Sequence, residues 1–356
     1  MRKLRYGIIG TGNIAMTKHL PGYAALADDV EIVAACDINE DSLKAAKEKY
    51  HIQYIFTDYH KLLKSEDIDF VSVCLPNYLH NPVSIEAMRS GKHVHCEKPM
   101  AMNHKQAEEM RMVKDETGKI LMIGLNNRFT GESQFVKRYI DEGNIGGIYH
   151  VKCGWQRRAC AGAYGWFTDK ELSGGGPLID LGVHYIDLVM YFMGYPAIRS
   201  VTAKTYSKLV KGEKGYLFTH DNSHLGKNTK FTVEDLAIGF IDLKQDTSID
   251  FEVSWASHIE KERIYYSFYG TKGGISFVKE DGESKLKIHT IVDEQHVDII
   301  PKVNNRIIAC NEFAEFVDCI RKQREPGISI LDQNVDMIGL IDAIYESSNK
   351  RKQIIL

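Results

Sequence analysis

The sequence lacks the features of several broad classes of protein. It has no uninterrupted apolar run near the ~18 residues that a membrane span needs. Its N-terminus has neither the apolar segment nor the cleavage site of a secretory signal. The formal net charge of −3 comes without a basic stripe, so neither a nucleic acid nor a membrane is an expected partner.

Cysteine is scarce and follows no recognisable pattern. The seven cysteines include no C-x-x-C pair, and Cys36, Cys74 and Cys96 lie in apolar, strand-like runs. An odd count of this kind favours reduced, buried thiols in a cytoplasmic protein over a disulfide framework. No spacing of histidine, cysteine and carboxylate residues fits a known metal site, so no metal is predicted.

The 356 residues are enough for two domains of ~150 residues each. Over residues 1–124, apolar runs alternate with helical patterns, which predicts an α/β Rossmann domain with a parallel sheet. The last expected helix has a capping box, with Asn103 as N-cap and Gln106 three residues on. The expected strands are residues 6–9, 31–36, 70–74, 93–96 and 120–124, and the expected helices are 40–50, 83–90 and 104–117.

Residues 125–356 follow a different pattern, because most expected strands there succeed one another without intervening helices. This order predicts an α+β domain with a large, mainly antiparallel open sheet. Residues 208–230 are expected to form a surface excursion, and the C-terminal helix is a candidate to pack back on the first domain. The expected strands are residues 147–156, 198–205, 236–243, 248–255, 264–269, 274–278 and 285–290, and the expected helices are 130–142, 178–193, 311–321 and 332–348.

A glycine turn follows the first expected strand, where residues 10–15 read Gly-Thr-Gly-Asn-Ile-Ala and fit G-x-G-x-x-A. Gly10 permits the tight turn, and Gly12 lets a pyrophosphate approach the backbone. The N-terminus of the next helix offers free N–H groups to the phosphates. The expected dinucleotide contacts are Gly10, Thr11, Gly12, Asn13 and Ile14.

Asp37 ends the second expected strand and is placed to accept hydrogen bonds from the adenosine ribose. Its carboxylate would repel a 2′-phosphate, and the following residues 38–40 provide no arginine to receive one. The sequence therefore favours NAD over NADP as the cofactor.

Two further segments carry polar residues in positions suited to chemistry. Glu97-Lys98-Pro99 follows a strand, and ligands of open α/β sheets bind beyond the carboxyl ends of strands. The proline disfavours helix at Lys98 and permits a cis peptide. A solvated Glu-Lys pair at a strand end explains the same residues.

The second segment is a glycine-rich run, residues 174–187, in which Asp180, His184 and Asp187 are spaced to share one face of an apolar helix. A buried polar row must find partners, and catalysis is one reason to keep such a row. A structural Asp–His pair inside the core is the other reading, and a metal site is disfavoured because the spacing is incomplete.

Together with the Leu75-Pro76-Asn77-Tyr78-Leu79-His80 segment, these motifs resemble the Gfo/Idh/MocA family, the glucose-fructose oxidoreductase and inositol dehydrogenase group. Residues 233–235, 254–256 and 270–274 also fit, so the resemblance covers essentially the whole chain. It implies a Rossmann domain followed by an open antiparallel sheet that often forms an oligomer interface. A homodimer or homotetramer is therefore expected.

The resemblance also implies site residues and an activity. The catalytic lysine maps to Lys98 and the Asp-x-x-x-His pair to Asp180 and His184, while cofactor contacts map to Leu75, Pro76, Asn77, His80, Glu97 and Lys98. Family members commonly move a hydride between nicotinamide and a secondary hydroxyl of a sugar or cyclitol. Histidine suits the coupled proton transfer because its ordinary pKa is ~6.5. Lysine suits a hydrogen bond to the reacting oxygen.

Substrate contacts are expected after the last Rossmann strand and near residues 155–158. Aromatic side chains there can stack on a sugar, although packing explains them equally well. Arg157 and Arg158 would bind an anionic substituent if they are not paired with surface carboxylates. The candidates are Asn126, Arg128, Trp155, Arg157, Tyr164 and Trp166.

Two other activities fit the same motifs. In one, tightly held NAD oxidises and then re-reduces a sugar during redox-neutral glycosidic cleavage. In the other, the protein binds a dinucleotide as a regulator without turnover. Retention of Lys98, Asp180 and His184 counts against a regulator, which has no need of these three side chains.

Overall fold

A computed structural model describes residues 2–158, 165–209, 230–303 and 311–356, which form two compact units. Unit 1 consists of Met1–Asn126 and Asn311–Ile338, and unit 2 of Asn127–Cys310 and Gly339–Leu356. The predicted second domain, residues 125–356, thus includes a segment that the structure places in unit 1. Most of the expected excursion at 208–230 lies outside the described residues.

Unit 1 contains a parallel six-stranded sheet in the order β3-β2-β1-β4-β5-β6. This is the strand order of the dinucleotide-binding fold, so the predicted Rossmann architecture is confirmed. The sequence did not predict β3, a three-residue strand at the sheet edge. The strands are β1 (Leu4–Ile9), β2 (Val30–Cys36), β3 (Tyr54–Phe56), β4 (Phe70–Val73), β5 (His93–Glu97) and β6 (Leu121–Gly124).

Side-chain caps fix where two helices of unit 1 begin. Asn39 accepts hydrogen bonds from the first turn of α2 (Glu40–Tyr50), and Asn103 does so for α5 (His104–Thr117), both as long as predicted. α4 (Asn77–Arg89) begins before its predicted start at residue 83. The predicted helix began after Pro82, whereas the helix in the structure contains this proline. The remaining helices are α1 (Leu20–Ala24), α3 (Tyr59–Leu63) and α10 (Glu312–Lys322).

Helix α10 covers an aromatic cluster of unit 1. The ring of Phe316 meets Phe70 edge-on with centroids 5.6 Å apart, and Phe313 meets Tyr23 at 4.9 Å. Phe316, Phe70 and Tyr23 are fully buried. A segment more than 200 residues along the chain therefore completes the core of the N-terminal sheet.

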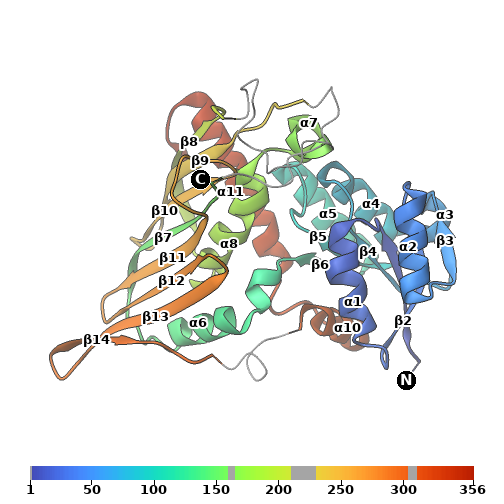
Figure 1. Ribbon diagram of the computed structural model, residues 1–356, viewed down its shortest axis with the longest axis horizontal. Helices are drawn as coiled ribbons and strands as arrows, with labels where there is room; N and C mark the ends of the chain where they lie inside the picture. The colour runs from blue at the N-terminus through green and yellow to red at the C-terminus, as the bar shows by residue number, and fades with distance from the viewer. Residues whose placement is uncertain (1, 159–164, 210–229, 304–310) are drawn as a thin grey trace. The chain divides into compact units, whose positions relative to one another are not determined.

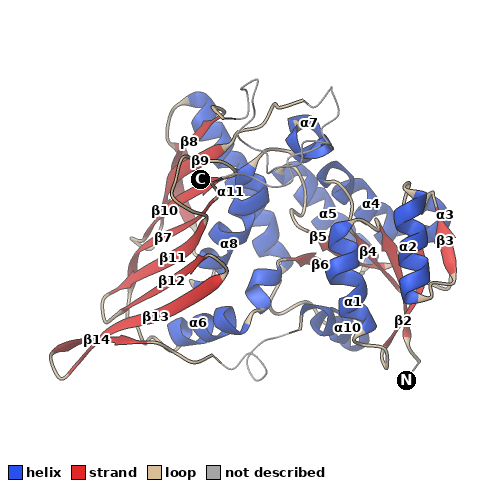
Figure 2. Cartoon of the chain, in the orientation of Figure 1, coloured by secondary structure: helices blue, strands red, loops and turns tan. Residues whose placement is uncertain are grey.

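Unit 2 contains a nine-stranded sheet in the order β14-β13-β12-β11-β7-β10-β9-β8-β15 (Figures 1 and 2). Among the strand pairs that the structure describes in this sheet, β10 and β7 alone run parallel, so the predicted mainly antiparallel sheet is confirmed. The sequence missed β14 and β15 at its two edges. The strands are β7 (Ile148–Gln156), β8 (Ile198–Tyr206), β9 (Leu236–Leu243), β10 (Ser248–Ser254), β11 (Arg263–Gly270), β12 (Gly274–Glu280), β13 (Glu283–Val292), β14 (Gln295–Ile299) and β15 (Ile354–Ile355).

One face of this sheet carries helices, and none of the described helices packs on the other (Figures 1 and 2). Helix α8 (Val183–Phe192) packs on β7, with α6 (Gly131–Asp141) beside it. Two serines of α11 (Leu331–Lys350), Ser347 and Ser348, accept hydrogen bonds from backbone N–H groups of β8. The short α7 (Lys170–Ser173) precedes the glycine-rich run.

Five of the seven cysteines lie among the described residues. Cys36, Cys74, Cys96, Cys153 and Cys319 are buried and free, and burial raises the pKa of the Cys96 thiol to about 12. Cys160 and Cys310 lie outside the described residues. In the described part of the chain, no helix combines the length and apolar character of a membrane span.

Candidate functional site

The glycine turn of unit 1 requires glycine at its first position. Gly10 has a φ of +94°, and a Cβ there would lie 2.2 Å from the carbonyl oxygen of Cys74. At Gly12 a Cβ would meet nothing within 4 Å, so the backbone stays open on the side that a phosphate needs. Asn13 and Ile14 follow with exposed side chains. The turn therefore fits a dinucleotide phosphate.

Asp37 anchors this turn from the end of β2. Its Oδ2 accepts hydrogen bonds from the Thr11 backbone N at 2.6 Å and from Thr11 Oγ1 at 3.0 Å. Its Oδ1 accepts one from the Asn39 backbone N at 2.8 Å. The aspartate predicted to contact ribose thus also holds the glycine turn, through a threonine that is itself buried.

A π-helical turn, Ala15–His19, follows the glycine turn and brings two side chains to Glu97. The Lys18 ammonium lies 3.2 Å from Glu97 Oε1, and His19 Nε2 lies 2.9 Å from the same oxygen. Burial opposes ionisation of Glu97, but Lys18 and the hydrogen bond from His19 outweigh it and hold the pKa well below its usual value. Glu97 is therefore an ordered, ionised carboxylate rather than a solvated one.

Helix α10 adds a second carboxylate to this buried cluster. Lys18 Nζ lies 3.2 Å from Glu312 Oε2, and His95 Nε2 lies 3.2 Å from Glu312 Oε1. Tyr23 OH donates to His95 Nδ1 at 2.8 Å, and burial lowers the pKa of His95. Sequence reasoning missed Lys18, His19 and Glu312, because the partners lie up to 294 residues apart and no motif joins them.

Lys98 follows Glu97, whose Oε2 accepts a hydrogen bond from the Lys98 backbone N at 3.1 Å, and the Lys98–Pro99 peptide is cis. His80 lies between two backbone carbonyls, with Nδ1 2.6 Å from the Pro99 oxygen and Nε2 2.8 Å from that of Leu75. His80 therefore lies between the segments that end β4 and β5, and its contact with the cofactor stays a prediction. Among the other candidates of this segment, Asn77 begins α4 and is buried, and Pro76 is its N-cap residue.

In unit 2, buried Glu234 holds the glycine-rich run. Its Oε1 accepts hydrogen bonds from the backbone N of Gly176 at 3.0 Å and of Leu178 at 3.1 Å, and from Tyr345 OH at 2.9 Å. A Cβ on Gly176 would lie 2.2 Å from the Glu234 carbonyl oxygen, and one on Gly175 would overlap Tyr345. The glycines are required because this carboxylate and this tyrosine approach the backbone so closely.

The segment that follows presents Asp180 and His184. Asp180 lies in a π-helical turn, Leu178–Gly182, and its Oδ2 accepts a hydrogen bond from Trp255 Nε1 at 2.9 Å. His184 lies in the first turn of α8, with its ring centroid 6.2 Å from that of Trp155. π-Helical turns often occur at functional sites. Here one follows the glycine turn of unit 1 and another lies within the glycine-rich run of unit 2.

Asp187 and Arg128 do not belong to this polar row. Arg128 is fully buried, and its guanidinium donates to Asp187 through Nε at 2.8 Å and Nη2 at 2.5 Å. Tyr195 OH donates to Asp187 at 2.6 Å. Arg128 thus forms an internal ion pair between the turn at Asn126–Phe129 and α8, and its contact with a substrate stays a prediction. Asn126 begins that turn and is half-buried.

Trp155 and Arg157 form a group with Glu262, which sequence reasoning also missed. Glu262 Oε1 accepts hydrogen bonds from Trp155 Nε1 at 2.7 Å and from Arg157 Nε at 3.2 Å. The Arg157 guanidinium lies 4.6 Å from the centroid of the Trp155 ring. Trp166 lies half-buried against Phe167, with ring centroids 5.0 Å apart, and Tyr164 lies outside the described residues.

Neither unit presents a metal site among the residues that the structure describes, where no three histidine, cysteine or carboxylate side chains are grouped to hold an ion. The polar residues collected here suit hydrogen bonding and proton transfer.

Two family descriptions match the chain. One is "Oxidoreductase family, NAD-binding Rossmann fold", over residues 4–125, and the other is "GFO/IDH/MocA C-terminal domain", over residues 133–276. Together they cover most of the sequence. The chain therefore belongs to the Gfo/Idh/MocA oxidoreductase family.

Curated relatives and solved structures agree with this assignment. The chain is 36% identical to the D-glucoside 3-dehydrogenase of Escherichia coli (strain K12), over 76% of each sequence. It is 29% identical to the myo-inositol 2-dehydrogenase of Thermotoga maritima, over 54% of this chain and 55% of that protein. A levoglucosan dehydrogenase solved in complex with NADH shares the fold, with a TM-score of 0.85, 21% identity and 99% of each chain covered.

Proposed function

We propose that this protein is an NAD-dependent dehydrogenase that moves a hydride between nicotinamide and a secondary hydroxyl of a sugar or cyclitol. The observation that carries the proposal is the match to D-glucoside 3-dehydrogenase across both units, in a chain that has kept Lys98, Asp180 and His184. Relatives named for glucosides, inositol and levoglucosan all act on hydroxylated rings.

NAD supplies the hydride acceptor when bound, and the residues of unit 1 suit it. The open backbone at Gly12 would hold the pyrophosphate, with Asp37 at the ribose of the adenosine. Glu97 and Asn77 would hold the nicotinamide side. The carboxylate of Asp37 favours NAD over NADP because it would repel a 2′-phosphate.

The chain's own groups would handle the proton and the alkoxide charge. His184 would take the proton of the reacting hydroxyl, and the Lys98 ammonium would donate a hydrogen bond to the same oxygen. Asp180, held by Trp255, would orient the sugar or the histidine. Each role uses the ordinary chemistry of its side chain.

The test is a panel of glycosides, free sugars and inositols with NAD and with NADP, followed by NADH absorbance. We expect turnover with at least one member and a higher kcat/KM with NAD. His184→Ala should lower kcat by roughly 10²–10⁴-fold, the usual contribution of general acid–base catalysis. Unchanged turnover in that variant would contradict the role of His184, and absence of NADH with every substrate would contradict the activity.

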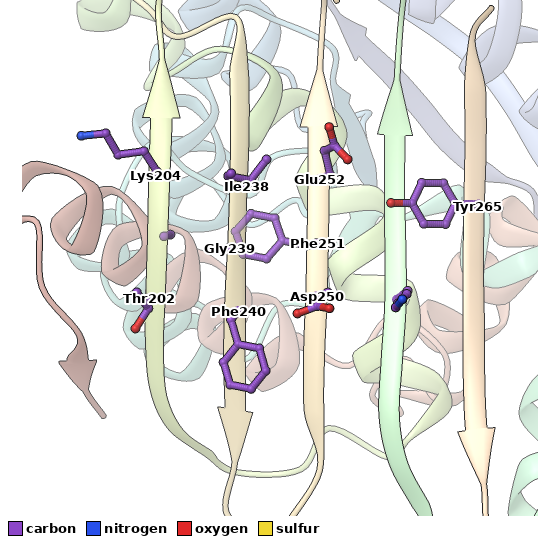
Figure 3. Close-up of a pocket in the computed structure, with 11 residues that line it drawn as sticks. Thr202, Lys204, Ile238, Gly239, Phe240, Asp250, Phe251, Glu252 and Tyr265 are labelled. Carbon is purple, nitrogen blue, oxygen red and sulfur yellow. The ribbon is translucent and has the colours of Figure 1, made fainter. Parts of the chain in front are cut away.

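We further propose that a second copy of the chain covers the open face of the unit 2 sheet. A hollow on this face has a volume of about 620 Å³. Residues of β8, β9, β10, β7 and β11, which Figure 3 draws, line it. Phe240 is exposed among the lining residues, which include side chains of opposite charge, and this allows a self-complementary contact. The charged lining residues are Lys152, Lys204, Asp250 and Glu252.

Light scattering coupled to size exclusion tests this interface. We expect a dimer or tetramer for the natural chain and a smaller species for Phe240→Glu, which places a charge in the contact.

The five free, buried cysteines of the described residues suit a reducing compartment, so we place the protein in the cytoplasm.

A further inference from the structure

Trp155, Arg157 and Glu262 lie beside the residue proposed to move the proton. The rings of Trp155 and His184 are 6.2 Å apart, and the Arg157 guanidinium lies 4.6 Å from the Trp155 ring centroid. A ring substrate whose reacting hydroxyl meets His184 therefore has its neighbouring substituents within reach of this group. Glu262 keeps half of its side chain exposed, so a ligand can reach the carboxylate.

Within this group, the carboxylate of Glu262 neutralises the guanidinium of Arg157. One oxygen of Glu262 takes both the indole N–H of Trp155 and the Nε–H of Arg157. The neighbouring arginine, Arg158, donates to the backbone carbonyl of Glu260 at 2.7 Å. The two arginines that could have formed an anion site are thus both engaged from one loop, the segment that precedes β11.

We infer that Glu262 makes this site selective for uncharged sugars, an inference that rests on the proposed dehydrogenase function. A carboxylate or phosphate substituent would have to displace Glu262 from Arg157 or lie against its negative charge. A neutral hydroxymethyl group does not need to displace Glu262 and is not repelled by its charge. Glu262 acts as a specificity-determining residue, because it discriminates between substrates by repulsion as well as by holding Trp155 in place.

The test compares methyl glucoside with methyl glucuronide. The first has a neutral hydroxymethyl group at the carbon where the second has a charged carboxylate. The natural chain should have the higher kcat/KM for the glucoside. Glu262→Gln keeps an oxygen acceptor for Trp155 and Arg157 but loses the charge, so it should shift the kcat/KM ratio toward the glucuronide by roughly fivefold. The shift should shrink in high salt, because the groups are partly exposed.

Glu260→Gln is the matched control, since it removes the same charge two residues away while its backbone carbonyl still binds Arg158. Equal shifts in the two variants, or a preference of the natural chain for the glucuronide, would overturn the inference. Tryptophan-fluorescence titration with each sugar provides a readout that does not depend on turnover. If no sugar is oxidised, the proposed function fails. Identical binding of both sugars to the natural chain would overturn the role of Glu262 independently.

Discussion

Substitutions at Gly10 and Gly12, two glycines of the same turn in unit 1, should separate an effect on folding from an effect on cofactor binding. Gly10→Ala places a Cβ against a backbone carbonyl at a positive φ, which should cost about 2–4 kcal/mol of unfolding free energy. Gly12→Ala meets no protein atom within 4 Å, so its Tm should match that of the natural chain. If Gly12 faces the pyrophosphate, its affinity for NADH should nevertheless fall at least about tenfold.

Thermal unfolding and NADH fluorescence measure the two effects separately. Full NADH affinity in Gly12→Ala would contradict the placement of the phosphates, whereas an unchanged Tm in Gly10→Ala would contradict the geometry of the turn.

Lys18 lies between the carboxylates of Glu97 and Glu312, with its Nζ 3.2 Å from an oxygen of each. Lys18→Met should lower stability by about 3–5 kcal/mol at pH 7, because both buried carboxylates lose their ion pair with this ammonium. NADH affinity should fall with it, since Glu97 loses the contact that orders it.

The effect of Lys18→Met should depend on pH. Burial opposes the charge of Glu97 and of Glu312, but Lys18 outweighs it and lowers the pKa of both groups. A carboxyl with a lowered pKa stabilises the fold above its unfolded pKa of ~4.3 and loses that contribution as the pH falls. Urea unfolding should therefore show a stability gap between the two proteins that stays constant down to about pH 5 and narrows as the pH falls below ~4.3. A gap that stays constant below that pH as well would mean that Lys18 acts by packing alone.

At the scale of elements, Glu234 joins the strand region before β9 to the start of the segment that carries Asp180 and His184. Glu234→Ala would leave the backbone N–H groups of Gly176 and Leu178 without their acceptor, which should cost about 1–3 kcal/mol per buried donor. The kcat should fall too, because the segment loses its anchor.

Glu234→Gln is the control for this change. Its amide oxygen still accepts hydrogen bonds from the backbone. Burial raises the pKa of Glu234 because it disfavours the charged carboxylate, and the neutral glutamine does not have this cost. We expect a Tm close to that of the natural chain. A similar loss in both variants would show that the charge, and not the acceptor, holds the segment.

Local sequence determined most elements of the fold. Asn103 caps α5 as predicted, with Gln106 N donating to its side chain. The Gln106 side chain accepts from Met102 N, one residue before the N-cap, rather than from the N-cap itself. The partners of buried charges were not predictable, because Arg128 with Asp187 and Lys18 with Glu312 meet only in the folded chain. The burial of Arg128 was therefore not evident from the sequence. Lys98, Asp180 and His184 were identified through motifs, and their catalytic roles remain predictions.

At the scale of the whole molecule, residues 311–338 complete the core of unit 1. Phe316 is fully buried against Phe70 and His95, so Phe316→Ala should cost about 3–5 kcal/mol. Ile330→Ala, in the same segment but partly exposed, should cost much less. Chemical denaturation followed by circular dichroism measures both, and equal costs would contradict the tight packing of α10.

The chain leaves unit 1 after Asn126, returns at Asn311 and leaves again after Ile338. On the ribosome, the glycine turn and its sheet emerge early, but the counter-charge of Glu312 and the aromatic cover of Phe316 emerge only after most of unit 2 has been made. The nucleotide fold therefore has to wait for synthesis of nearly the whole polypeptide before its core can close. If residues 1–126 alone were transferred to another protein, Lys18 would keep Glu97 but lose Glu312, one of its two carboxylate partners.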